Sequence, residues 1–167
     1  MNLIRYLKER KNSILKVENI YSLIFILLIF LLDRFSKVQI INNYNDKILF
    51  INNFINLDLI WNTGIGFGLL KSDSNIIYNI ISSLIGIVIS ILFYISIISQ
   101  KFEKFIFSII IGGALGNFYD RVFFSAVPDF IDLHYGNFHW FTFNLADIFI
   151  TIGIIIFLLK GLKIQNK

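Results

Sequence analysis

Four long apolar segments constrain the fold of this chain more than any other feature of its sequence. An α-helix needs about 20 consecutive apolar residues to cross the hydrocarbon core of a bilayer. The second segment carries no charged residue, and the third reaches that length only when Asp120 and Arg121 are included. The pattern predicts four transmembrane helices, at about residues 20–41, 76–98, 105–124 and 144–162.

The composition is typical of a membrane protein. Hydrophobic residues make up 56% of the 167 residues and charged residues 16%, whereas soluble domains average about 25% charged residues. The length favours one domain. The absence of cysteine excludes disulfides, thiolate metal sites and a cysteine nucleophile. The basic residues lie beside apolar segments, which indicates membrane topology rather than nucleic-acid binding.

The basic residues also indicate the orientation. Ten of the fifteen lie in residues 1–19, after the second apolar segment, or at the C-terminal end. An even number of spans places these three regions on one side, and the positive-inside bias makes that side the cytoplasm. We therefore expect a basic cytoplasmic leader at 1–19, a four-span domain at 20–163 and a cytoplasmic tail at 164–167. No small-residue cleavage site follows the first segment, so we expect it to be retained rather than removed as a signal peptide.

The two outer connections, at about 42–75 and 122–143, have the patterns of short strands. Both contain partly alternating apolar runs, with Asn-Thr-Gly and Tyr-Gly-Asn as turn signals. These features predict strands or hairpins in each connection. Four aromatic residues there are typical of an interfacial belt: Trp61, Tyr135, Trp140 and Phe141.

Polar residues recur at the outer ends of the apolar segments, where charge in hydrocarbon costs at least about 2.5–3.5 kcal/mol. Asp33 and Lys37 are four residues apart, which predicts an ion pair on one helix face. The alternative is an interfacial anchor. Asn144 and Asp147 open the fourth segment, where an N-cap and a helix-dipole contact are the simpler interpretation.

A second polar group closes the third segment. Asn117, Asp120 and Arg121 have the spacing of one helix face, and we expect Arg121 to hold Asp120 ionised in a structural salt bridge. Gly112 and Gly116 form a small-xxx-small pair that lets another helix approach closely. The alternative is a packing seam with a polar end.

Two further carboxylates, Asp129 and Asp132, lie in the second outer connection, where each alone is typical of a solvated loop. Two carboxylates that lie close together share one proton. One can then act as general base on a water and the other as general acid, which is aspartic peptide hydrolysis. Asp129, near a water-accessible edge, suits the base better than Asp120 does, although the residues alone do not decide between them.

Other chemistries fit the sequence less well. There is no G-x-S-x-G motif. Ser36 and Lys37 are adjacent, so on a helix they point about 100° apart and make a poor dyad. His134 and His139 could bind a metal with Asp132, but their spacing matches no zinc template, so we expect no metal and no cofactor.

Five motifs in this order resemble those of the signal peptidase II family, the lipoprotein signal peptidases. The resemblance runs from about Tyr21 to Leu162. The motifs are D-x-x-S/T-K at Asp33 to Lys37, N-x-G-x-x-F at Asn62, Gly64 and Phe67, GGA-x-GN-x-x-DR from Gly112 to Arg121, a V-x-DF-like stretch at Asp129, and FN-x-AD at Phe143, Asn144, Ala146 and Asp147.

The resemblance implies a membrane aspartic endopeptidase that removes signal peptides from diacylglyceryl-modified prolipoproteins by cleavage before the lipidated cysteine. Its catalytic aspartates would be Asp129 and Asp147. Nine residues would shape and brace the site: Asp33, Lys37, Asn62, Gly64, Asn117, Asp120, Arg121, Asn144 and Ala146.

The implied fold is an all-α membrane protein with four transmembrane helices and a small extracytoplasmic β-sheet, both termini being cytoplasmic. We expect a monomer in the bacterial inner membrane, surrounded by lipid, with its site at the extracytoplasmic face. The resemblance further implies inhibition by globomycin-type cyclic peptides. The sequence departs from the family pattern at Trp61, Pro128 and Phe141, and in Gly64-Ile65-Gly66-Phe67.

Two other functions remain as alternatives. A proton-coupled transporter would spread Asp33, Asp120 and Asp147 along a pathway and would show repeated broken helices. A non-catalytic assembly subunit would use the Gly112–Gly116 seam and would tolerate loss of Asp129 or Asp147.

Overall fold

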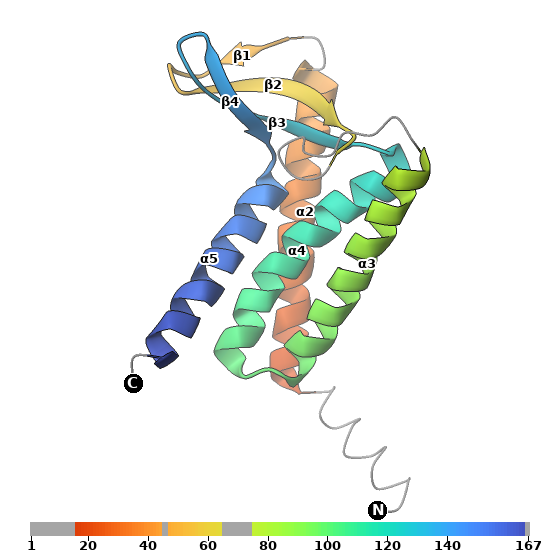
Figure 1. Ribbon diagram of the computed structural model, residues 1–167, viewed down its shortest axis with the longest axis vertical. Coiled ribbons are helices and arrows are strands. Elements are labelled where there is room, and N and C mark those ends of the chain that lie inside the picture. Colours follow the sequence, from red (N-terminus) through yellow and green to blue (C-terminus); the bar gives the residue numbers. More distant parts are fainter. Residues whose placement is uncertain (1–15, 45–46, 65–74, 166–167) are drawn as a thin grey trace, which may run out of the picture.

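The computed structural model describes residues 16–44, 47–64 and 75–165. It consists of four long helices with a four-stranded antiparallel sheet at one end (Figure 1). The helices are α2 (Val17–Tyr44), α3 (Asn75–Ile98), α4 (Lys101–Phe124) and α5 (Leu145–Gln165). The strands are β1 (Leu49–Phe50), β2 (Ile55–Asn62), β3 (Val127–Tyr135) and β4 (Phe138–Phe143). The expected mostly helical fold with a small sheet is confirmed.

Each helix contains one of the apolar segments, but the ends differ from the expected ones. The helix α2 begins at Val17, so the end of the expected leader is helical; residues 1–15 and 166–167 lie outside the described part of the chain. The helix α4 begins at Lys101, and Lys104 lies in its first turns rather than in a loop. The Lys104 ammonium donates to the carbonyls of Ser96 and Ile97, both at 2.9 Å, and so caps the end of α3.

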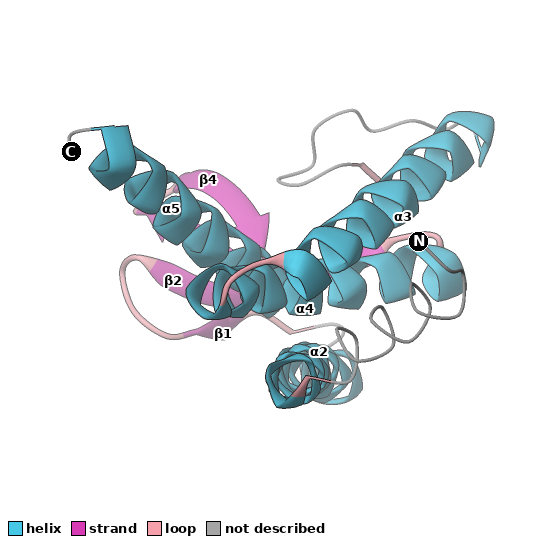
Figure 2. Ribbon diagram, turned by 90° about the horizontal axis from the view of Figure 1, so that it is seen from below, coloured by secondary structure: helices cyan, strands magenta, loops and turns pink. Residues whose placement is uncertain are grey.

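The helix α4 lies at the centre of the bundle and contacts the other three helices (Figure 2). Glycines permit its close approach to two of them. A Cβ added to Gly112 would lie 2.7 Å from the Ile29 side chain of α2, and one added to Gly113 would lie 2.6 Å from the Ala146 carbonyl oxygen of α5. The expected close approach at the Gly112–Gly116 pair is therefore present, with α2 as the partner helix.

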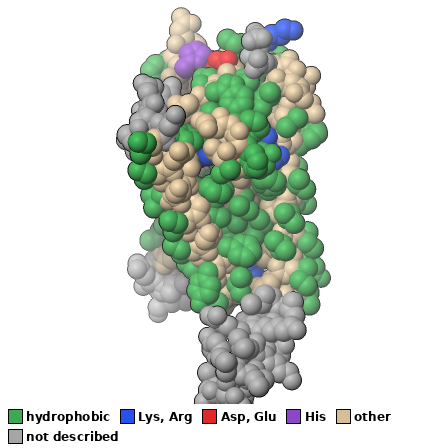
Figure 3. All heavy atoms as spheres, turned by 90° about the vertical axis from the view of Figure 1, so that its right-hand side faces the viewer, with side chains coloured by type: hydrophobic (Ala, Val, Ile, Leu, Met, Phe, Trp, Pro, Cys, Tyr) green, Lys and Arg blue, Asp and Glu red, His purple; other side chains and the backbone are tan. Residues whose placement is uncertain are grey.

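Apolar side chains cover the outside of the bundle as well as its core. Figure 3 shows hydrophobic side chains over the helical part of one face, with histidine and acidic side chains at the sheet end. Within the described part of the chain, two helical stretches are long and apolar enough to cross a membrane: Tyr78–Ile98, with a mean hydropathy of 2.5, and Leu145–Leu162, with 2.3. The helices α2 and α4 carry buried ionic side chains instead.

The sheet has the strand order β1-β2-β3-β4. Strands β3 and β4 form a hairpin whose two-residue turn begins at Gly136, with φ 58°, a conformation that glycine adopts without strain. The expected hairpin at Tyr-Gly-Asn is therefore present. Only Asn144 separates the end of β4 from the start of α5, so the sheet directly positions the first turn of that helix.

Candidate active site

Asn144 caps α5 through a reciprocal pair of hydrogen bonds. Its side-chain oxygen accepts from the backbone N–H of Asp147 at 3.1 Å, and the Asp147 carboxylate accepts from the backbone N–H of Asn144 at 3.1 Å. This is the geometry of a capping box, with Asn and Asp in the two positions. The N-cap interpretation of Asn144 is thus confirmed, and the cap fixes the direction of the Asp147 carboxylate.

The same asparagine holds a second carboxylate. Its side-chain amide nitrogen donates to Asp129 Oδ1 at 2.6 Å, and the amide of Asn62 donates to Asp129 Oδ2 at 2.8 Å. Asp129 comes from β3 and is only 3% exposed, so it is not the solvated loop carboxylate that it resembles when considered alone. The contacts of Asn144 therefore bring the carboxylates of Asp129 and Asp147 to one place.

The surroundings of Asp129 favour its protonated form. Burial, and next the charge of Asp147, raise the pKa of Asp129 to about 6, although the amides of Asn62 and Asn144 oppose this shift. A carboxyl group with such a pKa exchanges protons near neutral pH, which is what acid–base catalysis requires.

Asp147 is connected to the helix α4 through Asn117. The amide nitrogen of Asn117 donates to Asp147 Oδ1 at 2.8 Å, and its oxygen accepts from Lys37 Nζ at 2.8 Å. The orientation of the Asn117 amide group is fixed, because Lys37 can only donate a hydrogen bond and the Asp147 carboxylate accepts one. The contact therefore orients Asp147 against α4.

Lys37 is the centre of a buried ionic cluster between α2 and α4. Its ammonium donates to Asn117, to Asp33 Oδ2 at 2.7 Å and to Asp120 Oδ2 at 2.7 Å, so all three N–H groups are used. The expected Asp33–Lys37 pair is present, and both side chains are fully buried rather than anchored at an interface. Asp33 Oδ1 also accepts from the backbone N–H of Ala146 at 2.9 Å, which joins α2 to the first turn of α5.

The expected salt bridge between Asp120 and Arg121 is not formed. Asp120 instead pairs with Lys37 and with Arg34, a residue that the sequence analysis did not select. Successive residues of a helix point about 100° apart, so Asp120 faces α2 whereas Arg121 faces the end of β2. The sequence signal that could have indicated the Arg34–Asp120 pair was the position of Arg34 directly after Asp33, near the sheet end of α2.

Arg121 holds the turn that follows β2. Its guanidinium donates to the carbonyl oxygens of Gly64 at 3.3 Å and Asn117 at 3.1 Å. The side-chain oxygen of Asn62 accepts from the backbone N–H of Gly64 at 2.8 Å, which closes the same turn. Asn62 and Gly64 therefore lie at the site as expected; Phe67, of the same motif, lies outside the described residues.

Asp132 is not part of this arrangement. It is 4% exposed, which corrects the expectation of a solvated carboxylate, and it contacts His139 rather than either of the two joined aspartates. A groove of about 260 Å³ lies beside Asp147. It is lined by that aspartate and five mostly apolar neighbours: Phe141, Phe143, Ile148, Thr151 and Ile152.

Comparison with known proteins agrees with these features. The family model of signal peptidase (SPase) II matches residues 25–163. A lipoprotein signal peptidase of Pelagibacter ubique (strain HTCC1062) is 45% identical over 157 residues, covering 92% of this chain and 95% of that protein. One of Anaplasma phagocytophilum (strain HZ) is 39% identical over 156 residues, covering 90% and 97%.

A solved structure of a bacterial membrane enzyme has the same fold. It matches with a TM-score of 0.70 and 30% identity, over 86% of this chain and 88% of that chain. The expected resemblance is confirmed by the family model, by these relatives and by the fold. The chain belongs to the signal peptidase II family.

Proposed function

We propose that Asp129 and Asp147 are the catalytic pair with which this signal peptidase removes the signal peptide of diacylglyceryl-modified prolipoproteins, cleaving before the lipidated cysteine. The observation that carries the proposal is the position of Asn144. One side chain touches a carboxylate from β3 and caps the helix that presents the other. Such an arrangement supports a pair rather than two independent structural acids.

The reaction follows from a single proton on this pair. The ionised carboxylate removes a proton from a water molecule, whose oxygen attacks the scissile carbonyl carbon. The protonated carboxyl group donates its proton to the carbonyl oxygen. Collapse of the tetrahedral diol then breaks the C–N bond as the amine takes up a proton from one carboxyl group of the pair. The other carboxylate takes the proton of a diol hydroxyl, so the pair returns to its starting state.

The remaining polar residues position the pair in this proposal. Asn62 and Asn144 supply amide donors to Asp129, and Asn117 supplies one to Asp147. Behind them, Lys37 with its partner carboxylates fixes Asn117, while Arg121 fixes the Asn62–Gly64 turn. Fixed donors of this kind keep catalytic groups in their reactive orientation.

The groove beside Asp147 supports a substrate that carries lipid. Its lining is almost entirely apolar, and α5 exposes apolar side chains along the same stretch, such as Ile152 and Ile155. Acyl chains bound there would place the residue that carries them next to the pair. Globomycin-type cyclic peptides would act by occupying the same groove.

We further propose that all four helices span the bacterial inner membrane in a monomer, with both termini in the cytoplasm and the sheet outside. The basic residues at the helix ends remote from the sheet support this orientation. The sheet carries exposed aromatic side chains, including Trp61, Tyr135 and Trp140, as expected at a membrane interface.

The test uses the purified chain in detergent and a synthetic diacylglyceryl precursor peptide. Asp129→Asn and Asp147→Asn should each lower cleavage by about 100- to 10,000-fold, because each removes one proton-transfer group. Release of the signal peptide is followed by mass spectrometry, which also identifies the cleaved bond.

The matched control is Asp58→Asn, which removes a carboxylate of β2 that lies outside the hydrogen-bond network of the pair. It should leave cleavage within about twofold of wild type, as surface substitutions usually do. Normal cleavage by both active-site variants, with their thermal stability retained, would contradict the assignment of the pair. Absence of cleavage by the wild type would favour a transporter or an assembly subunit.

A further inference from the structure

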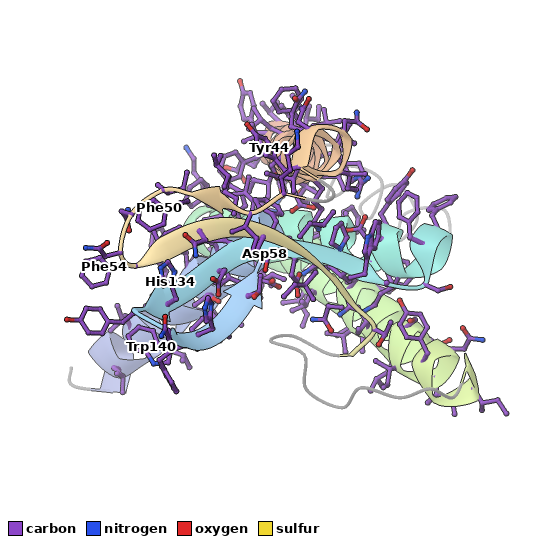
Figure 4. All side chains as sticks on the ribbon, turned by 90° about the horizontal axis from the view of Figure 1, so that it is seen from above. Tyr44, Phe50, Phe54, Asp58, His134 and Trp140 are labelled. Carbon is purple, nitrogen blue, oxygen red and sulfur yellow. The ribbon has the colours of Figure 1, made fainter. Side chains whose placement is uncertain are left out.

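A second cluster of chemically active side chains lies on the β3–β4 hairpin. Asp132 and His134 are two residues apart on β3 and so project from the same face of the sheet. His139 of β4 is the direct cross-strand neighbour of His134. One oxygen or nitrogen atom from each of the three residues lies within 4.8 Å of the others. Figure 4 labels His134 on this part of the sheet.

The cluster contains a polar atom that the described residues do not satisfy. Asp132 and His134 are each 4% exposed, and the Nδ1 atom of His134 has no hydrogen-bond partner among the described residues. It lies 3.7 Å from Asp132 Oδ2, which is too long for a hydrogen bond. The same oxygen is 2.7 Å from Nδ1 of His139. An unsatisfied buried nitrogen therefore points toward a carboxylate oxygen that already has one imidazole beside it.

From this geometry we propose that Asp132, His134 and His139 bind a divalent transition-metal ion, of which Zn²⁺ fits best. One carboxylate oxygen and two imidazole nitrogens are a donor set that zinc accepts. The metal would use the Nδ1 lone pair that has no other partner. The ligand atoms must move closer together, because Zn–N and Zn–O distances are about 2.0–2.2 Å.

The surroundings allow that movement and leave a coordination position for water. The side chain of His139 is 56% exposed, so its ring can rotate toward the ion, whereas Asp132 and His134 are held by burial. This inference departs from the expectation of no metal, which rested on sequence spacing alone. A hairpin brings residues 134 and 139 opposite each other, whereas the known spacing templates describe other folds.

The site is separate from the proposed catalytic pair, but its two strands lead to both members of the pair. Asp129 precedes Asp132 by three residues on β3, and β4 ends immediately before Asn144. An ion held between the strands would stabilise the hairpin that carries Asp129 and precedes α5. The proposal does not depend on the catalytic assignment, since it concerns binding and stability.

The test measures Zn²⁺ binding to the full-length chain in detergent, after treatment with EDTA and its removal by dialysis. Isothermal titration calorimetry with ZnCl₂ should give one ion per chain, and the thermal midpoint of unfolding should rise with Zn²⁺. The chain has only two histidines and no cysteine, so competing sites of this type are few. Binding should weaken as the pH falls, because protons compete with the metal for its ligand atoms.

Two variants and one control decide the outcome. His139→Ala, at an exposed side chain, and Asp132→Asn should each weaken Zn²⁺ binding at least about 100-fold. Loss of a residue that only hydrogen-bonds to a metal ligand already weakens binding by about 10- to 100-fold, and these two residues are proposed to bind the ion directly. The control Asp58→Asn removes a carboxylate from the same sheet and should bind as the wild type does. The unfolding midpoint in EDTA shows whether each variant is folded.

Either of two results would overturn the proposal. One is the absence of binding by the folded wild type at millimolar Zn²⁺, which would leave a simple His139–Asp132 hydrogen bond as the role of the cluster. The other is binding that persists undiminished in both variants, which would place the ion elsewhere. Co²⁺ adds a spectroscopic readout, since four- or five-coordinate Co²⁺ bound in the site absorbs visible light more strongly than the free hexa-aqua ion.

Discussion

Asn144 uses both ends of its side-chain amide. The oxygen accepts from the Asp147 backbone to cap α5, and the nitrogen donates to Asp129. Aspartate could cap the helix but, when ionised, could not donate a hydrogen bond, and it would add a third carboxylate beside the other two. Asparagine thus meets the structural and the electrostatic requirement at one position.

A prediction at this scale concerns Asn62, whose amide stabilises the ionised form of Asp129. Asn62→Leu removes that donor and should raise the pKa of Asp129 above its value of about 6. With Asp147 ionised, Asp129 takes up the single proton of the pair as the pH falls below about 6, so cleavage by the wild type should decrease as the pH rises above about 6. In Asn62→Leu this alkaline limb of the kcat/KM profile should move to higher pH.

The control for this measurement is Asn53→Leu, at an exposed position between β1 and β2. Its profile should coincide with that of the wild type. A lower activity of Asn62→Leu with an unchanged alkaline limb would show that Asn62 has only a structural role.

At the scale of helices and strands, glycines determine which helices meet at the site. Gly116 faces the carboxylate of Asp33, whose other oxygen accepts from the backbone N–H of Ala146 in α5, and Gly113 faces the carbonyl of Ala146. A larger residue at either position would separate α4 from its neighbours. The geometry of the proposed pair therefore depends on how closely these helices pack.

Gly116→Ala tests this dependence. Its added methyl group would overlap the Asp33 carboxylate, so the free energy of unfolding should fall by about 1–3 kcal/mol, as in other overpacked interiors. Gly161→Ala in α5 meets no atom within 4 Å and should raise stability by up to about 1 kcal/mol, because alanine favours a helix. Thermal unfolding in detergent compares the two. Equal effects of both substitutions would disprove the proposed packing role.

The helices and the hairpin could be predicted because their signals are local. Apolar length defined four helices, Tyr-Gly-Asn defined a turn, and the four-residue spacing of Asp33 and Lys37 predicted their pair. Contacts between distant segments could not be obtained in this way. The pair of Arg34 with Asp120 and the capping of α3 by Lys104 depend on how the helices rotate against each other. The meeting of Asp132 with His139 depends on the strand register, which a bulge between Leu133 and His134 shifts.

At the scale of the whole molecule, the proposed pair lies where the sheet meets the helix ends. The sheet supplies Asp129 and Asn62, and the first turn of α5 supplies Asp147 (Figure 1). A site at such a boundary can accept a substrate whose lipid remains in the bilayer while the hydrolytic water enters from outside. The membrane orientation proposed above is what makes this possible.

That orientation can be tested with single cysteines, since the chain has none of its own. Asn137→Cys lies at the exposed tip of the β3–β4 hairpin, and Gln100→Cys lies at the exposed turn between α3 and α4, at the opposite end. In intact spheroplasts a membrane-impermeant maleimide should label the first and not the second. Gln100→Cys should react only after the membrane is permeabilised; its labelling in intact spheroplasts would reverse the proposed topology.

The ionic cluster around Lys37 has a consequence for how the protein is made. As the chain leaves the ribosome, α2 emerges with Asp33 and Lys37 already paired, but the guanidinium of Arg34 has no counter-charge until Asp120 arrives, more than eighty residues later. Two cations and two anions then neutralise one another. In the proposed membrane orientation, the charge of Arg34 in α2 is therefore neutralised only after α4 has been synthesised. Until then, α2 must be kept out of direct contact with lipid.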